Sequence, residues 1–161
     1  MKPIKVAMIG VGNCASSLVQ GVTYYRQNNS AQGLIHEKIG GYGAGDVEFV
    51  LGVDVDARKV GLDIAEAIFA SPNNTKVFQQ DIAPTGAKVI MGKISDGVAP
   101  HMTTVGEKGF IVSDEAEADQ AHLTAVRVAR EHQVCLTVRQ VNERTGVVQQ
   151  HDAHRAGLAR V

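Results

Sequence analysis

A glycine-rich turn near the start of the chain has residue types and a spacing suited to holding a phosphate group. Gly10, Gly12 and Ala15 follow the pattern G-x-G-x-x-G/A. In a dinucleotide-binding turn the first glycine allows a tight bend, the second lets the backbone approach a pyrophosphate, and the small third residue permits close helix packing. The N-terminus of the following helix would offer free N–H groups to the anion. Because the same pattern also marks ordinary strand–helix turns, its context must decide.

The residues on either side of this turn favour nucleotide binding. Residues 5–9 form a short apolar run, which is typical of a buried parallel strand. After the turn, apolar residues recur at helical spacing and predict an amphipathic helix. They are Ala15, Leu18, Val19, Val22 and Tyr25.

An acidic residue after the second expected strand is the candidate ribose ligand. Residues 47–55 alternate as a mostly buried strand does, and they contain Asp54 near their end. A carboxylate there can accept both ribose hydroxyls and would repel a 2′-phosphate, which favours NAD over NADP. It follows the glycine turn by about forty residues instead of the usual twenty or so, because a polar, glycine-rich surface loop over residues 28–45 intervenes. Asp56 fits better as the N-cap of the next helix.

The later elements predict an α/β fold. Residues 57–70 have the amphipathic pattern of a helix, residues 71–75 end it, and residues 87–91 read as a third strand. Ser113 is the expected N-cap of a helix that reaches about residue 132, and residues 134–138 can form a further strand. Alternating strands and helices predict a Rossmann-type doubly wound parallel sheet, complete or cut short.

The composition excludes several classes of protein. The chain has 161 residues and a formal net charge of −1, without a basic run, which argues against a nucleic-acid partner. Its apolar stretches are too short to cross a membrane, and its N-terminus leaves no room for a signal peptide before the first strand. Two cysteines, Cys14 and Cys135, suggest no disulfide framework. We therefore expect a cytoplasmic protein.

The end of the chain differs in composition from its beginning. All eight lysines lie at or before Lys108, six of the eight arginines lie at or after Arg127, and no aromatic residue follows Phe110. We expect an NAD-binding domain over residues 1–138 and a weakly patterned polar tail over residues 139–161.

Several strings in the first part of the chain resemble the prokaryotic inositol-3-phosphate synthases. They are G-V-G-N-C-A-S-S-L from Gly10, D-V-D-A from Asp54 and A-I-F-A-S-P-N-N-T from Ala67. The resemblance covers about residues 1–102. From turn propensities alone we would interpret the two asparagines of the last string, Asn73 and Asn74, as part of a turn that ends a helix. The resemblance implies instead that they lie near a cofactor. The candidate cofactor-binding residues are Gly10, Gly12, Asn13, Cys14, Ala15, Asp54, Asn73 and Asn74.

The resemblance implies conversion of glucose 6-phosphate to an inositol phosphate with bound NAD, by oxidation, enolisation, aldol closure and reduction. Family members also form homo-oligomers. They are much longer, however, and their substrate-binding lysines have no counterpart here. Where the family has an L-P-V-G-S turn, this chain has Leu136-Thr137-Val138-Arg139-Gln140. A truncated chain, or one with a replaced distal segment, would therefore lack the catalytic half. We assign no catalytic residue, and we expect glucose 6-phosphate to be a partner only if the catalytic region is supplied elsewhere.

Other readings stay open. The chain could be a non-catalytic NAD-binding or regulatory module, or a generic NAD-dependent dehydrogenase. His151 and His154 have helical spacing for a metal, but a third ligand is missing, so we expect solvated histidines and no metal. Cys14 lies at a helix N-terminus, which favours a thiolate, yet without a partner base we interpret it as a small residue packed in the turn.

Overall fold

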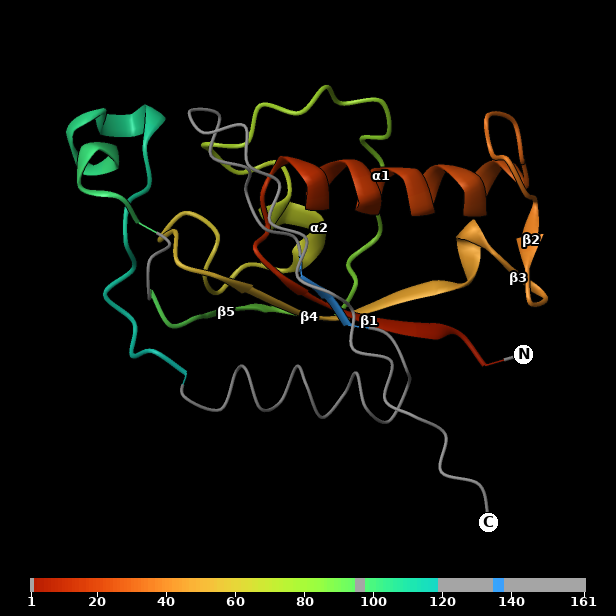
Figure 1. Cartoon of the computed structure of the whole chain (residues 1–161), viewed down its shortest axis with the longest axis horizontal. Helices are drawn as coiled ribbons and strands as arrows, with labels where there is room; N and C mark the ends of the chain where they lie inside the picture. Colours follow the sequence, from red (N-terminus) through yellow and green to blue (C-terminus); the bar gives the residue numbers. More distant parts are fainter. Residues whose placement is uncertain (1, 95–97, 119–134, 138–161) are drawn as a thin grey trace, which may run out of the picture.

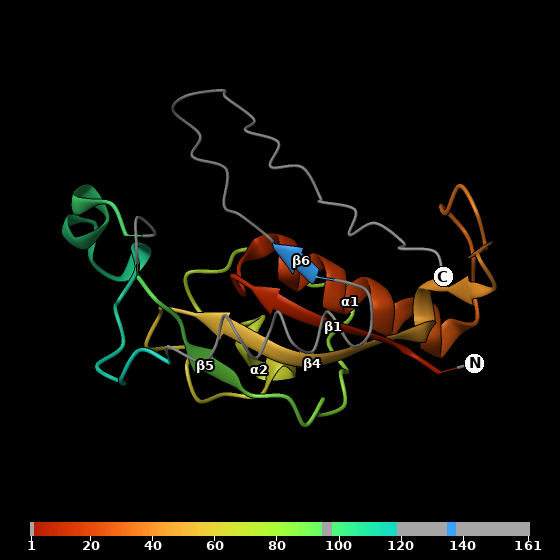
Figure 2. The same cartoon turned by 60° about the horizontal axis from the view of Figure 1, so that its bottom comes forward.

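A four-stranded parallel sheet forms the centre of the computed structural model, which describes residues 2–94, 98–118 and 135–137. Its strands are β1 (Ile4–Ile9), β4 (Val47–Asp54), β5 (Val89–Met91) and β6 (Cys135–Thr137). They lie in the order β5-β4-β1-β6, and each neighbouring pair is parallel. In chain order this is third, second, first, fourth, as in the Rossmann fold. Figure 2 shows the four strands side by side, and the predicted fold class is confirmed.

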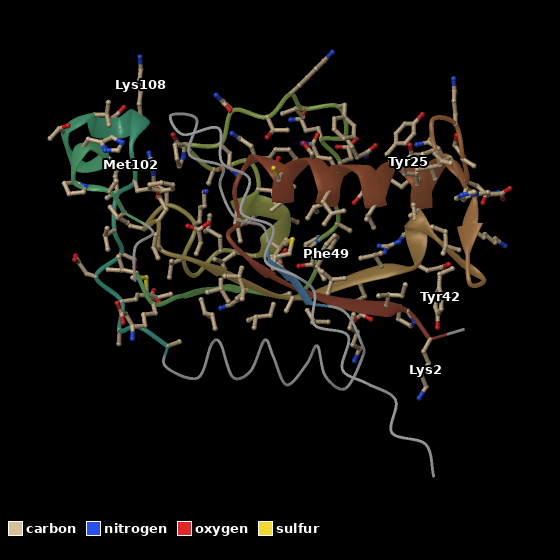
Figure 3. All side chains as sticks on the ribbon, viewed as in Figure 1. Lys2, Tyr25, Tyr42, Phe49, Met102 and Lys108 are labelled. Carbon is tan, nitrogen blue, oxygen red and sulfur yellow. The ribbon has the colours of Figure 1, made fainter. Side chains whose placement is uncertain are left out.

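Two helices cover one face of this sheet. Helix α1 (Asn13–Asn28) runs along the sheet, and the short helix α2 (Ile64–Ala67) lies on the same side (Figure 1). Phe49 lies between α1 and the sheet (Figure 3). The buried residues between these layers are Val6, Met8, Val11, Ala15, Val19, Val22, Phe49, Ile64, Ala67, Ile68, Ala87 and Val89.

A register shift in β4 changes which of its side chains face α1. Val6 pairs with Phe49, but the next residue, Ala7, pairs with Leu51, so Val50 is an extra residue. An inserted residue moves the alternation by one and exchanges the two faces of the strand. Phe49 therefore packs under α1, whereas Leu51 belongs to a cluster on the opposite face. Beyond the shift the even-numbered residues of β4 lie on the α1 face.

Gly52 shows how closely the layers approach on that face. A Cβ added to it would lie 3.0 Å from Val89, 3.2 Å from Ile64 and 3.3 Å from Val11. These separations are shorter than an ordinary van der Waals contact, so a side chain at this position would force the layers apart.

The expected surface loop over residues 28–45 is confirmed, with a small hairpin inside it. Strands β2 (Lys38–Ile39) and β3 (Tyr42–Gly43) pair in antiparallel fashion, and a 3-10 turn (Ala44–Asp46) leads into β4. Arg26 of α1 donates from Nε to the Gly45 carbonyl at 3.0 Å, which fastens the loop to the helix. Two further 3-10 helices are η2 (Pro100–Thr104) and η3 (Gly106–Lys108). Within the described residues, they and the hairpin lie at opposite ends, marked in Figure 3 by Met102 and Lys108 and by Tyr42.

The prediction of a single helix over residues 57–70 is wrong. Hydrogen-bonded turns occupy its first part, and α2 spans only four residues. Gly61 has a φ of +88°, a left-handed conformation that ends a helix. Asp63 then starts α2 as an N-cap, because its side chain accepts a hydrogen bond from the Ala65 N–H at 2.8 Å. The apolar spacing was compatible with both arrangements, and Gly61 and Asp63 decide between them.

The helix expected to begin at Ser113 is not present over residues 114–118. The Ser113 hydroxyl accepts a hydrogen bond from the Glu115 N–H at 3.2 Å, but no helix follows within the described part of this segment. The remainder of the expected helix and the polar tail lie outside the described residues. The strand expected over residues 134–138 is present as β6.

No helix in the described part of the chain combines the length and apolar character needed to cross a bilayer.

Candidate nucleotide-binding site

The glycine turn joins the carboxyl end of β1 to α1, as the sequence predicts. Gly10 has a φ of +93°, which a residue with a side chain rarely adopts, and its N–H donates to the Val53 carbonyl at 2.8 Å. Gly12 is the N-cap of α1, and no described side chain caps this end of the helix. Ala15 is fully buried, as expected for the small third position of the motif.

Asp54 lies against this turn at the end of β4, on the α1 face that the register shift gives it. One carboxylate oxygen, Oδ2, accepts a hydrogen bond from the Val11 N–H at 2.7 Å. The other, Oδ1, accepts from the N–H groups of Val55 and Asp56 at 2.8 and 3.1 Å. The side chain is buried at 7% exposure. It therefore holds the backbone of the turn, and ribose binding by Asp54 stays a prediction.

Lys59 is a site residue that the sequence reasoning missed. It is fully buried, and its Nζ donates to the Val11 carbonyl and to Asn73 Oδ1, both at 2.9 Å. Its Nζ also lies 3.6 Å from Asp54 Oδ2, as an ion pair. Burial lowers the pKa of Lys59, and the charges of Asp54 and Asp56 oppose that shift only in part.

The segment 71–75 is bonded to the glycine turn at two places. Asn73 Nδ2 donates to the Val11 carbonyl at 3.0 Å and to the Ile68 carbonyl at 3.0 Å. Asn13 Oδ1 accepts from the Asn74 N–H at 2.8 Å, while Asn13 Nδ2 donates to Asn74 Oδ1 at 2.8 Å. The structure thus brings both asparagines to the turn, and their contact with a cofactor stays a prediction.

Cys14 differs from its expected place. Its side chain is exposed on the first turn of α1, so its interpretation as a residue packed in the turn is wrong. Within the described ranges no group of three or more His, Cys, Asp or Glu side chains is placed to hold a metal ion. His151 and His154 lie outside them.

Asp56 and Arg58 form an ion pair just beyond the carboxyl end of β4. Asp56 is fully buried and accepts from the Arg58 backbone N–H at 2.9 Å, which stabilises a turn. Its expected role as a helix N-cap is wrong, because no helix begins there and Asp63 caps α2 instead. The Arg58 guanidinium binds both Asp56 oxygens at 2.8 and 2.6 Å, and it also donates to the carbonyls of Glu107 and Gly109 at 2.7 Å. Burial raises the pKa of Asp56, but hydrogen bonds from Arg58 and Ile111 outweigh it, so the pKa lies below its ordinary value.

The fold and the turn define a Rossmann-type α/β domain, and comparison with known proteins extends this result. No family model matches the chain. It is 46% identical to the inositol-3-phosphate synthase of Mycolicibacterium smegmatis over 138 residues, which are 84% of this chain and 35% of that protein. It is 50% identical to the inositol-3-phosphate synthase of Mycobacterium tuberculosis over 101 residues, which are 61% of this chain and 27% of that protein.

A solved structure gives the same picture of a partial match. The crystal structure of Ari2 superposes with a TM-score of 0.60 and 26% sequence identity, over 85% of this chain and 38% of that one. The chain thus resembles inositol-3-phosphate synthases over most of its residues, and it spans about a third of the length of the first of these relatives.

Proposed function

We propose that this chain binds NAD at the glycine turn and corresponds to the nucleotide-binding part of an inositol-3-phosphate synthase. One observation carries the proposal: the turn between β1 and α1 has dinucleotide-motif spacing, and the distant segment 71–75 is hydrogen-bonded directly to it. The similarity to inositol-3-phosphate synthases supports the same assignment.

The start of α1 would hold the pyrophosphate of the dinucleotide. Gly12 has no side chain to cover the first N–H groups of the helix, and no other described side chain caps them. These donors and the helix dipole favour an anion at this position. Asp54, at the end of the neighbouring strand, is the proposed ribose ligand, and its negative charge would select NAD over NADP.

Catalysis of inositol phosphate formation would need more than these residues. The chemistry implied by the resemblance calls for groups that stabilise an enolate oxygen, and we assign no such group among the described residues. We propose that these 161 residues on their own turn over little or no glucose 6-phosphate, and that turnover requires a catalytic region supplied elsewhere.

Calorimetric titration with NAD and NADP tests the binding proposal. Gly12→Ala places a methyl group where the pyrophosphate would approach, and we expect it to weaken NAD binding by about tenfold or more. Gly21→Ala is the matched control, because it lies on the same helix and its added Cβ meets no atom within 4 Å. A folded wild-type chain that gives no heat with NAD, or equal affinities for both variants, would overturn the proposal.

A further inference from the structure

We propose that Lys59 is a positioning residue that orients the peptide between Val11 and Gly12 toward a bound pyrophosphate. The inference rests on the proposed NAD binding and adds a residue that the glycine motif does not contain. Lys59 comes from the turn after β4 and is fully buried beneath the glycine turn.

Both polar backbone groups of Val11 are held by side chains. Its N–H donates to Asp54 Oδ2 at 2.7 Å, and its carbonyl accepts from Lys59 Nζ at 2.9 Å. These two side chains are themselves an ion pair at 3.6 Å. The residue between the two motif glycines is thus fixed at both ends by one buried pair of opposite charges.

Fixing the Val11 carbonyl also fixes the direction of the next N–H group. The peptide between Val11 and Gly12 is trans, since the cis bond found among the described residues joins Ser71 to Pro72. In a trans peptide the C=O and the following N–H point in opposite directions. The Val11 carbonyl points to Lys59, so the Gly12 N–H points away from it. Rotation of this peptide would present a carbonyl oxygen to the phosphate side in place of an N–H donor.

The ammonium group is costly for a purely packing role. Burial of a charge is unfavourable, which the lowered pKa of Lys59 reflects, and apolar residues of similar volume often replace buried ion pairs without loss of stability. What the ammonium adds is direction, because it bridges the Val11 carbonyl and Asn73 Oδ1 at 2.9 Å each. Without it, the Asn73 amide at 3.0 Å would be the one described side chain still bonded to that carbonyl.

The test compares ligands with and without a pyrophosphate on Lys59→Met, which keeps the volume and removes the charge. We expect NAD and ADP to bind about tenfold more weakly, by equal factors, while adenosine binding measured by NMR stays unchanged. The Gly12 amide resonance should also shift in the free protein. Lys59→Gln keeps a shorter donor and should give a smaller loss with the same pattern, and it decides the matter if Lys59→Met does not fold.

Asp63→Asn is the matched control, because Asp63 secures α2 and the turn at residues 85–86 without touching the glycine turn. It should lower stability and leave the affinity for NAD unchanged. Equal weakening of ADP and adenosine, or unchanged NAD affinity in a folded Lys59 variant, would overturn the role of Lys59 alone. A wild-type chain that binds no NAD would overturn the proposed function as well.

Discussion

Asn13 and Thr75 are joined by three hydrogen bonds, although 62 residues separate them. The Thr75 N–H and hydroxyl donate to Asn13 Oδ1 at 3.1 and 2.9 Å, and the same hydroxyl lies 3.0 Å from the Asn13 carbonyl. The segment after α2 is therefore fastened to the first turn of α1.

We expect Asn13→Ala to lower the free energy of unfolding by about 1–2 kcal/mol, since each net hydrogen bond contributes about 1 kcal/mol. Urea unfolding followed by circular dichroism measures the change. Ser17→Ala, at an exposed position of the same helix, is the control and should have little effect. Equal stability of the two variants would contradict the fastening role of Asn13.

Alanine at Gly10 and at Gly21 should have opposite effects on stability. Gly10 has a φ of +93°, so Gly10→Ala forces a side chain into a strained conformation at a cost of about 1–2 kcal/mol. Gly21 lies inside α1 with free space around it, so Gly21→Ala should stabilise the protein by about 0.5–1 kcal/mol. Urea midpoints of both variants against the wild type check the signs, and a stabilising Gly10→Ala would show that the turn has another conformation.

Asp54→Ala should destabilise the fold strongly. The change removes the acceptor of the Val11 N–H and leaves the buried Lys59 ammonium without its charged partner, and breaking a buried pair costs about 3–5 kcal/mol. Asp54→Asn keeps one carbonyl acceptor and should cost less. Thermal unfolding of both variants checks the order. If Asp54→Ala is as stable as the wild type, Asp54 does not support the turn. A weaker affinity of this variant for NAD would then report the loss of ribose binding alone.

The carboxylate of Asp63 makes stability depend on pH in the acid range. Burial raises its pKa, but hydrogen bonds from Ala65, Thr85 and Gly86 outweigh burial and hold the pKa below its ordinary value of 3.8. The contribution is therefore fully present above that value and is lost as the pH falls through the lowered pKa. We expect Asp63→Asn to flatten the change in unfolding free energy between neutral and acid pH. An unchanged pH profile in this variant would contradict the prediction.

The strand, turn and helix at the start of the chain could be predicted because their signals are local. An apolar run, two glycines and a helical period suffice, and β1, Gly10 and α1 appear where those signals lie. The third and fourth strands of the parallel sheet were predicted in the same way.

The rest depends on contacts between distant residues, which a local pattern does not contain. The extra residue Val50 exchanges the faces of β4, and this follows from pairing with β1. The local pattern predicts Lys59 as an exposed charge on an amphipathic helix. Gly61 has a left-handed conformation that prevents this helix, and the Lys59 side chain is buried under Val11. Its nearness in sequence to Asp54 was the one available signal.

The partners that shape the glycine turn come from much later in the chain. Lys59 and Asn73 reach the Val11 carbonyl from sequence separations of 48 and 62 residues. Closing loops of this length costs chain entropy before any contact repays it. During synthesis the glycine turn therefore leaves the ribosome before segment 71–75, and it cannot take its final shape until that segment has followed. We expect competence for nucleotide binding to arise late in folding, although its motif precedes both of these partners in the sequence.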